Sequence, residues 1–158
     1  MTNTSHPVRL AGSVLDRSRH VCAFFNSKEE EYRVLLPFIK EGFEVGDKAF
    51  HIVDSRRRSE HLRQLEHADV DVAAAQDSHQ LEVRGWEDAY LRGGHFDQNA
   101  MLELIQEVLA GGKAQGFPLT RLMANMEWAL EDRPGVDDVV EYETRLNYIL
   151  PKYNDAVV

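Results

Sequence analysis

The sequence predicts a three-layer α/β/α sandwich with a mainly parallel central sheet. Short apolar segments typical of strands alternate along the chain with amphipathic segments long enough to form helices. The connections between the predicted strands are long enough for βαβ crossovers, which return each strand parallel to the one before it. Helices then cover both faces of the sheet, so near-continuous apolar strands are the expected pattern.

The first predicted strand is the apolar run Val21–Phe25, which polar residues bound on both sides. A helix over about residues 28–44 follows it. Ser27 is placed to accept from the backbone N–H of Glu30, whose carboxylate can reach back toward the turn, as in a capping box. Ligands of open α/β sheets gather at the carboxyl ends of strands, beside the helices that follow. Residues 25–30 are therefore the first region in which to expect a site.

The remaining elements follow from the same two patterns. Asp54 or Ser55 is placed to cap the second long helical segment, and Asp97 the fourth. Gly46 is placed to end the first helix in a left-handed conformation. The further strands are expected at 48–53, 80–84, 119–125 and 155–158, and the further helices at 55–65, 71–77, 97–115 and 136–150.

Length and composition indicate one domain. The chain has 158 residues, 43% of them hydrophobic and 28% charged, which suffices for a real core. Residues 1–18 are predicted to be a flexible N-terminal arm and residues 19–158 a single domain. The net charge of −9 argues against non-specific binding to nucleic acid or to an anionic membrane.

The expected location is the cytoplasm. Cys22 is the single cysteine, which excludes an internal disulfide and fits a reducing compartment. No apolar run approaches the ~20 residues that a membrane span needs. The N-terminus also lacks the apolar core of a signal peptide.

The sequence gives no positive case for an enzyme or for a cofactor. The turn after Val21–Phe25 lacks the Gly-x-x-x-x-Gly-Lys-Ser/Thr pattern of a phosphate-binding loop, and three consecutive glutamates follow it. No Ser-His-Asp set, nucleophile elbow or carboxylate pair stands out. Nucleoside triphosphate chemistry at this turn is therefore not expected.

His20 and Cys22 are two residues apart on the predicted first strand, so their side chains point to the same face. They can form a thiolate–imidazole pair or contribute to a soft-metal site. Two ligands do not make a metal site, however, and free cysteine usually behaves as a small hydrophobe. We therefore predict a structural role for the pair and no metal site. His51, between two apolar neighbours, is predicted to be a satisfied core histidine.

Four motifs occur in a characteristic order. They are HVCAFF from His20, LPFIKEG from Leu36, WEDAYL from Trp86 and MEWAL from Met126. Together they resemble the MEDS domain, the methanogen/methylotroph DcmR sensory domain, from about residue 20 to the C-terminus. The resemblance implies a RecA/KaiC-like fold that has lost its phosphate-binding loop. It also implies a sensory role toward small organic compounds such as hydrocarbon derivatives.

Domains of this family are usually coupled to histidine kinases, anti-sigma-factor kinases or DNA-binding domains. This chain carries no such output domain. It is therefore expected to be either a stand-alone module with a separate partner or a piece of a longer signalling protein.

The crevice rule and the resemblance together predict a ligand site at the carboxyl ends of the strands. Trp86 can line such a pocket or simply pack in the core. Glu127 can contact a ligand, pair with an arginine or cap a helix. The candidate ligand-binding residues are Phe25, Asn26, Asp54, Trp86, Asn125 and Glu127.

The leading hypothesis is a sensory or regulatory domain that binds a small organic ligand and signals through contacts with a protein such as a histidine kinase or a transcription regulator. A ligand-free interaction module that regulates a kinase or transcription factor is the alternative, and a nucleotide-binding relic is the third. Direct nucleic-acid or membrane contact is not expected. A homodimer is compatible with signalling, but no residue demonstrates it. The sequence names neither the ligand nor the partner.

Overall fold

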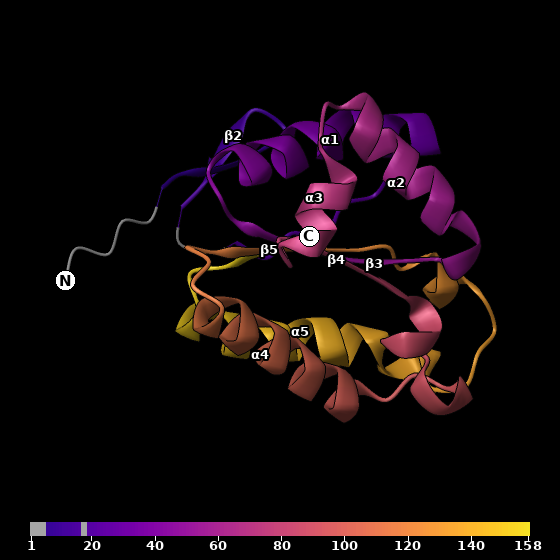
Figure 1. Cartoon of the computed structure of the whole chain (residues 1–158). Coiled ribbons are helices and arrows are strands. Elements are labelled where there is room, and N and C mark those ends of the chain that lie inside the picture. Colours follow the sequence, from indigo (N-terminus) through magenta and orange to yellow (C-terminus); the bar gives the residue numbers. More distant parts are fainter. Residues whose placement is uncertain (1–5, 17–18) are drawn as a thin grey trace.

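The computed structural model of the chain describes residues 6–16 and 19–158. Its centre is a four-stranded parallel sheet with the strand order β4-β3-β5-β6 (Figure 1). The predicted three-layer α/β/α fold with a parallel sheet is confirmed. The helices and strands are β1 Val8–Leu10, β2 Ser13–Leu15, α1 Lys28–Glu44, β3 Lys48–Val53, α2 Arg58–His67, α3 Val72–Asp77, β4 Leu81–Gly85, α4 Gln98–Ala114, β5 Thr120–Ala124, α5 Val139–Ile149 and β6 Ala156–Val157.

Helices α1, α2 and α3 cover one face of the sheet, and α4 and α5 cover the other (Figure 1). Alternation along β3 divides the core accordingly. Phe50 and Ile52 point into the cluster that includes the α4 and α5 side chains. Ala49 and Val53 point into the cluster on the side of α1, α2 and α3. Every residue of β3 is buried, as expected for a central strand covered on both faces.

Helix α1 has the predicted bounds and the predicted caps. The Ser27 hydroxyl accepts from the Glu30 N–H at 3.2 Å. The Glu30 carboxylate accepts from the backbone N–H of Asn26 at 2.7 Å, one residue before the position of a standard capping box. Gly46 follows the helix with φ +81°, in the left-handed region that glycine tolerates. The start of α1 is thus held rigidly beside the ends of the strands.

The predicted buried strand Val21–Phe25 is wrong. This segment follows an isolated parallel bridge from His20 to Val157 at the outer edge of the sheet. The Val21 N–H still donates to the Val157 carbonyl at 2.9 Å, but β6 spans only two residues and offers no longer ladder. Phe24 is 94% exposed. An apolar run in sequence therefore lies here on an open edge.

Residues 1–18 were expected to be a flexible arm. Residues 1–5 and 17–18 lie outside the part that the structure describes. Between them, β1 and β2 form an antiparallel hairpin. Val8 is fully buried and Leu10 nearly so, both in the cluster that contains the apolar face of α1. Burial of these two side chains makes the hairpin part of the folded layer.

Arg121 on β5 is the largest charged side chain in the core, with 2% of its surface exposed. Its Nε donates to Asp47 at 2.8 Å, and its Nη1 donates to Glu41 at 2.9 Å and to the Phe38 carbonyl at 2.8 Å. The sequence did not predict this network, which joins α1 to the sheet.

No helix within residues 6–16 and 19–158 is both long and apolar enough to cross a membrane.

Candidate functional site

A cavity of about 500 Å³ opens at the carboxyl ends of β3 and β5, between α1 and α2. Its apolar wall comes from Leu36, Val53 and Met123. Charged side chains surround that wall, so the cavity has an apolar wall and a polar rim. The other lining residues are Lys28, Glu29, Glu31, Tyr32, Arg33, Asp54, Arg57, Glu60, His61, Gln64 and Asn125.

A chain of hydrogen bonds leads from this cavity into the core. The Tyr32 hydroxyl lies 2.9 Å from His61 Nδ1, and His61 Nε2 lies 2.8 Å from His51 Nδ1. The three residues come from α1, α2 and β3. If the tyrosine donates to His61 Nδ1, the N–H at His61 Nε2 donates to His51 Nδ1. His51 is buried and hydrogen-bonded to His61, in line with the prediction of a core histidine.

Burial keeps these imidazoles neutral. It lowers the pKa of His61 to about 4, with a further contribution from the nearby charge of Lys28. Burial also lowers the pKa of His51 well below its usual value, and His61 adds to this effect. Burial and the neighbouring Glu31 raise the pKa of Tyr32 to about 12. At neutral pH the hydrogen-bonded series Tyr32–His61–His51 therefore presents uncharged groups to a ligand.

Two cationic groups at or beside the cavity, Lys28 and Arg56, have anionic partners. Lys28 Nζ lies 2.6 Å from both Glu31 and Glu127. Arg56 binds Asp54 through Nη2 at 2.7 Å, and this contact lowers the pKa of the Asp54 carboxyl. These ion pairs reduce the positive charge available to a phosphate.

Three of the predicted site residues lie at this cavity. Asp54 and Asn125 line it, and Glu127 stands at its edge through the ion pair with Lys28. Asn125 is held from several directions. Its backbone N–H donates to the Ile52 carbonyl at 2.8 Å, and its side-chain oxygen accepts from the Glu127 N–H at 3.1 Å.

The other three predicted residues lie elsewhere. Trp86 is 2% exposed in the core beneath α4 and α5, and its indole N–H donates to the Asn125 carbonyl at 2.8 Å. Phe25 packs against the core on the side of α1. Asn26 turns its side-chain amide toward Glu30. Among the described residues, none of these three lines the cavity.

Tyr32 and His61 are the site residues that the sequence reasoning missed. In the sequence, Tyr32 repeats with Leu35, Leu36 and Ile39 as part of an apolar helix face, and His61 has no metal-ligand spacing to the other histidines. One signal was available: His61 precedes the buried Leu65 by four residues, which places it on the inward face of α2. What the sequence does not contain is the distance between α1 and α2, which decides that the two side chains meet.

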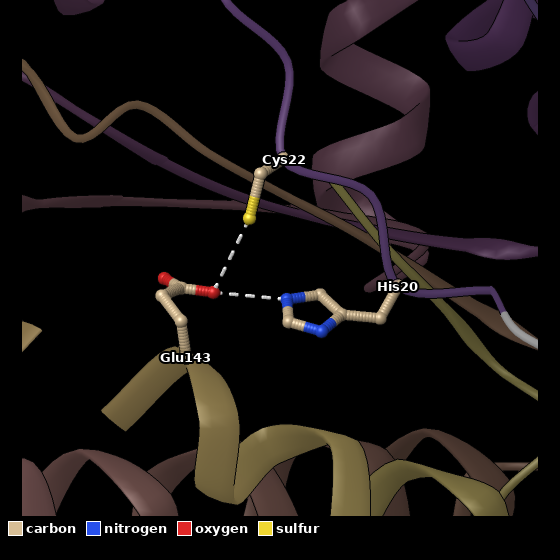
Figure 2. Close-up of side chains that lie close together, drawn as sticks. All are labelled: His20, Cys22 and Glu143. Carbon is tan, nitrogen blue, oxygen red and sulfur yellow. Dashed lines mark hydrogen bonds and ion pairs between the residues drawn. The ribbon is translucent and has the colours of Figure 1, made fainter. Parts of the chain in front are cut away.

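His20 and Cys22 lie outside the cavity and meet a third residue. Glu143 of α5 approaches both of them, with its Oε2 2.9 Å from His20 Nε2 and 3.6 Å from Cys22 Sγ (Figure 2). The hydrogen bond with Glu143 raises the pKa of His20. Partial burial of the sulfur and the negative charge of Glu143 raise the pKa of Cys22, although the residue as a whole is exposed. A reactive thiolate–imidazole pair is therefore disfavoured in this arrangement.

The fold and the cavity define a parallel α/β domain with a solvent-accessible chamber at its strand ends. Comparison with known proteins then identifies its family. The model of the MEDS family, described as "MEthanogen/methylotroph, DcmR Sensory domain", matches residues 19–158, so the chain belongs to the MEDS family.

A curated relative is the transcriptional repressor DcmR of Methylorubrum extorquens (strain DSM 6343 / CIP 106787 / DM4). It is 26% identical over 142 residues, which are 90% of this chain and 51% of the relative. The chain thus spans about half the length of this relative. No solved structure matches the chain significantly.

Proposed function

We propose that this chain is a sensory domain that binds a small organic molecule in the cavity at the strand ends and passes the signal on by protein–protein contact. The observation that carries this proposal is the cavity itself, with an apolar wall and the neutral Tyr32–His61–His51 chain at its polar side. Small-molecule sites in proteins typically measure about 300–1,000 Å³ and combine apolar walls with a few polar groups. Membership of a family described as sensory supports the same conclusion.

The arrangement favours a small, largely uncharged ligand over a nucleotide. The turn from Phe25 to Ser27 contains no glycine, and the backbone N–H of Asn26 already donates to the Glu30 carboxylate. Lys28, the lysine nearest to this turn, is bound by Glu31 and Glu127. Alcohols, amides and alkyl halides suit the apolar wall and the neutral polar groups of the chamber better. The domain acts here as a receptor rather than an enzyme.

The signal is proposed to pass through helices α1 and α2, because both contribute side chains to the cavity wall. A ligand that contacts Tyr32 and His61 together stabilises one distance between the two helices. A transcription regulator is the proposed kind of output, since the relative DcmR is named a transcriptional repressor. That output places the domain in the cytoplasm.

The test first compares the mass of the purified protein in native and in denaturing mass spectrometry. It then measures how each compound of a panel of small organic molecules changes the Tm of the protein. We expect a retained small mass, or a panel member that raises Tm in the wild type and not in Leu36→Trp, whose indole fills the chamber. Leu130→Trp is the matched control, because Leu130 is 88% exposed and does not line the cavity. Equal shifts in all three proteins, or no mass and no shift at all, would contradict ligand sensing at this site.

A ligand-free interaction module remains the second candidate. The observation in its favour is a set of large apolar side chains left in solvent. Phe24 is 94% exposed, and Val140 and Tyr148 on α5 are each 77% exposed. Native mass also reports the number of subunits, so a concentration-dependent dimer without bound ligand would favour this candidate.

A further inference from the structure

The His20–Cys22–Glu143 cluster brings three metal-binding atom types to one point outside the cavity. His20 Nε2, Cys22 Sγ and a Glu143 carboxylate oxygen all lie within 4.8 Å of one another (Figure 2). Two of them come from the segment at the sheet edge and the third from α5. Glu143 follows His20 by 123 residues and Cys22 by 121 residues in the sequence, and the fold brings the three together.

We propose that these three side chains form a binding site for a divalent cation of the Zn²⁺ type, with a fourth coordination position open to water or to an exogenous ligand. Imidazole nitrogen, thiolate sulfur and carboxylate oxygen are the donors that Zn²⁺ uses in proteins. With the thiolate and the carboxylate ionised and the imidazole neutral, the site carries two negative charges, which match those of the cation.

The separations suit tetrahedral coordination. Zn²⁺ bonds of about 2.0 Å to nitrogen and oxygen and about 2.3 Å to sulfur separate ligand atoms by roughly 3.3–3.6 Å. The observed distances from the Glu143 oxygen are 2.9 Å to His20 Nε2 and 3.6 Å to Cys22 Sγ. The separation of His20 Nε2 from Cys22 Sγ is at most 4.8 Å, so rotation of the side chains has to draw these two atoms together around the ion.

A second layer of contacts orients the ligands. His20 Nδ1 lies 2.9 Å from the side-chain oxygen of Asn147, one helical turn after Glu143 on α5. An amide oxygen only accepts, so Nδ1 donates to Asn147. Nε2 donates to the Glu143 carboxylate in the metal-free arrangement and is the nitrogen that gives up its proton to bind the cation. The backbone of the same segment is fixed by the Val21 N–H to Val157 carbonyl bond at 2.9 Å. Buried Tyr142 and Leu146 hold α5 in place on either side of Glu143 along the helix.

The surroundings leave a route for the ion. The side chains of His20 and Glu143 are 8% and 21% exposed, whereas Cys22 is exposed. Zinc sites with three protein ligands and an open fourth position bind substrates or effectors there. Without an ion, a histidine–glutamate ion pair and a hydrogen bond from the Cys22 thiol to the same carboxylate oxygen hold the three side chains together, and the experiment below separates this arrangement from the metal site.

The experiment measures Zn²⁺ affinity by calorimetry with a competing chelator, and the absorption spectrum with Co²⁺ in its place. We expect one ion per chain and a thiolate-to-cobalt charge-transfer band. Cys22→Ser should abolish the band and weaken Zn²⁺ binding at least ~100-fold, and Glu143→Gln should weaken it at least ~10-fold. Asn147→Ala should weaken binding by about 10-fold or more, the usual effect of losing an outer-shell partner.

Two matched controls and one measurement without mutation complete the design. Glu141→Gln alters an exposed carboxylate of the same helix, and His67→Gln alters an exposed imidazole; both should bind as the wild type does. Because Cys22 is the only thiol, its alkylation by iodoacetamide in the wild type is read directly by mass, and stoichiometric Zn²⁺ should slow it at least ~10-fold. Wild-type affinity in Cys22→Ser, or unprotected alkylation, would overturn the metal site and leave only the ion pair.

Discussion

At the scale of single residues, Arg121 is the largest charged side chain buried in the core. Its guanidinium is 2% exposed and contacts Asp47, whose side chain is fully buried, and Glu41 of α1. Removing Arg121 leaves the buried Asp47 carboxylate with His6 Nε2, at 2.8 Å, as its remaining side-chain partner, and such a loss costs far more than the pair itself contributes. Arg121 therefore stabilises the contact between α1 and β5, two of the elements that frame the cavity.

We predict that Arg121→Met lowers the free energy of unfolding by about 3–5 kcal/mol. Urea unfolding at pH 7 measures this change. Arg133→Met is the control, because its ion pair with Glu131 has side chains 37% and 46% exposed, and such pairs contribute less than about 1 kcal/mol. Similar losses in the two variants would show that Asp47 is not held by Arg121.

The buried histidines predict how stability depends on pH. In the unfolded chain both titrate near 6.5, whereas in the fold the pKa of His61 is about 4 and that of His51 is lower than usual. The unfolded state therefore takes up protons first as pH falls, and stability is lost between about pH 6.5 and 4. His61 alone accounts for up to roughly 3 kcal/mol over that window.

Urea midpoints at pH 7, 6, 5 and 4.5 measure this loss. The groups that face His61 are Tyr32 and Lys28 from α1 and His51 from β3. His61→Gln should flatten the dependence, and His67→Gln, an exposed histidine of the same helix, should not. If the urea midpoint of the wild type did not change with pH, or if it changed equally with pH in the two variants, His61 and His51 would not be neutral in the fold.

At the scale of elements, the bounds of a helix or strand can be predicted where residues close together in the sequence determine them. The bounds of α1 and β3 match the prediction because a capping serine, a glycine stop and an apolar run act within a few residues. Val21–Phe25 has the same apolar signal as β3, yet only His20 reaches a bridge with β6. Whether an apolar run becomes a central strand or an edge depends on partners far away in sequence.

Gly135 shows such a distant constraint in a loop. Its φ is +89°, and a Cβ there would overlap the carbonyl oxygen of Phe96, whose N–H donates to the Pro134 carbonyl at 3.0 Å. Gly135→Ala should therefore destabilise the fold by at least ~1 kcal/mol more than Gly116→Ala. Gly116 has φ +91° but open space around it. Thermal unfolding of the two variants makes the comparison, and equal losses would mean that φ alone matters.

At the scale of the whole molecule, only some of the residues of the candidate site can be predicted from the sequence. The rule that ligands gather at strand ends placed Asp54 and Asn125 correctly beside the chamber that the structure contains. Trp86 satisfied the same rule but lies in the opposite core, because its side-chain direction depends on how α4 and α5 pack. Tyr32 and His61 could not be predicted as site residues, because they meet only where α1 approaches α2.

The central claim is that a small organic ligand binds in the chamber between α1 and α2. Methyl-labelled methionine provides the most direct test, because Met123 lines the chamber whereas Met101, a residue of α4, lies in the core on the other face of the sheet. Titration of wild-type protein with the compound panel, followed by NMR, should shift the Met123 methyl resonance saturably and leave that of Met101 in place. If no compound moves Met123, or if any compound that binds moves Met101 instead, the chamber is not the sensory site.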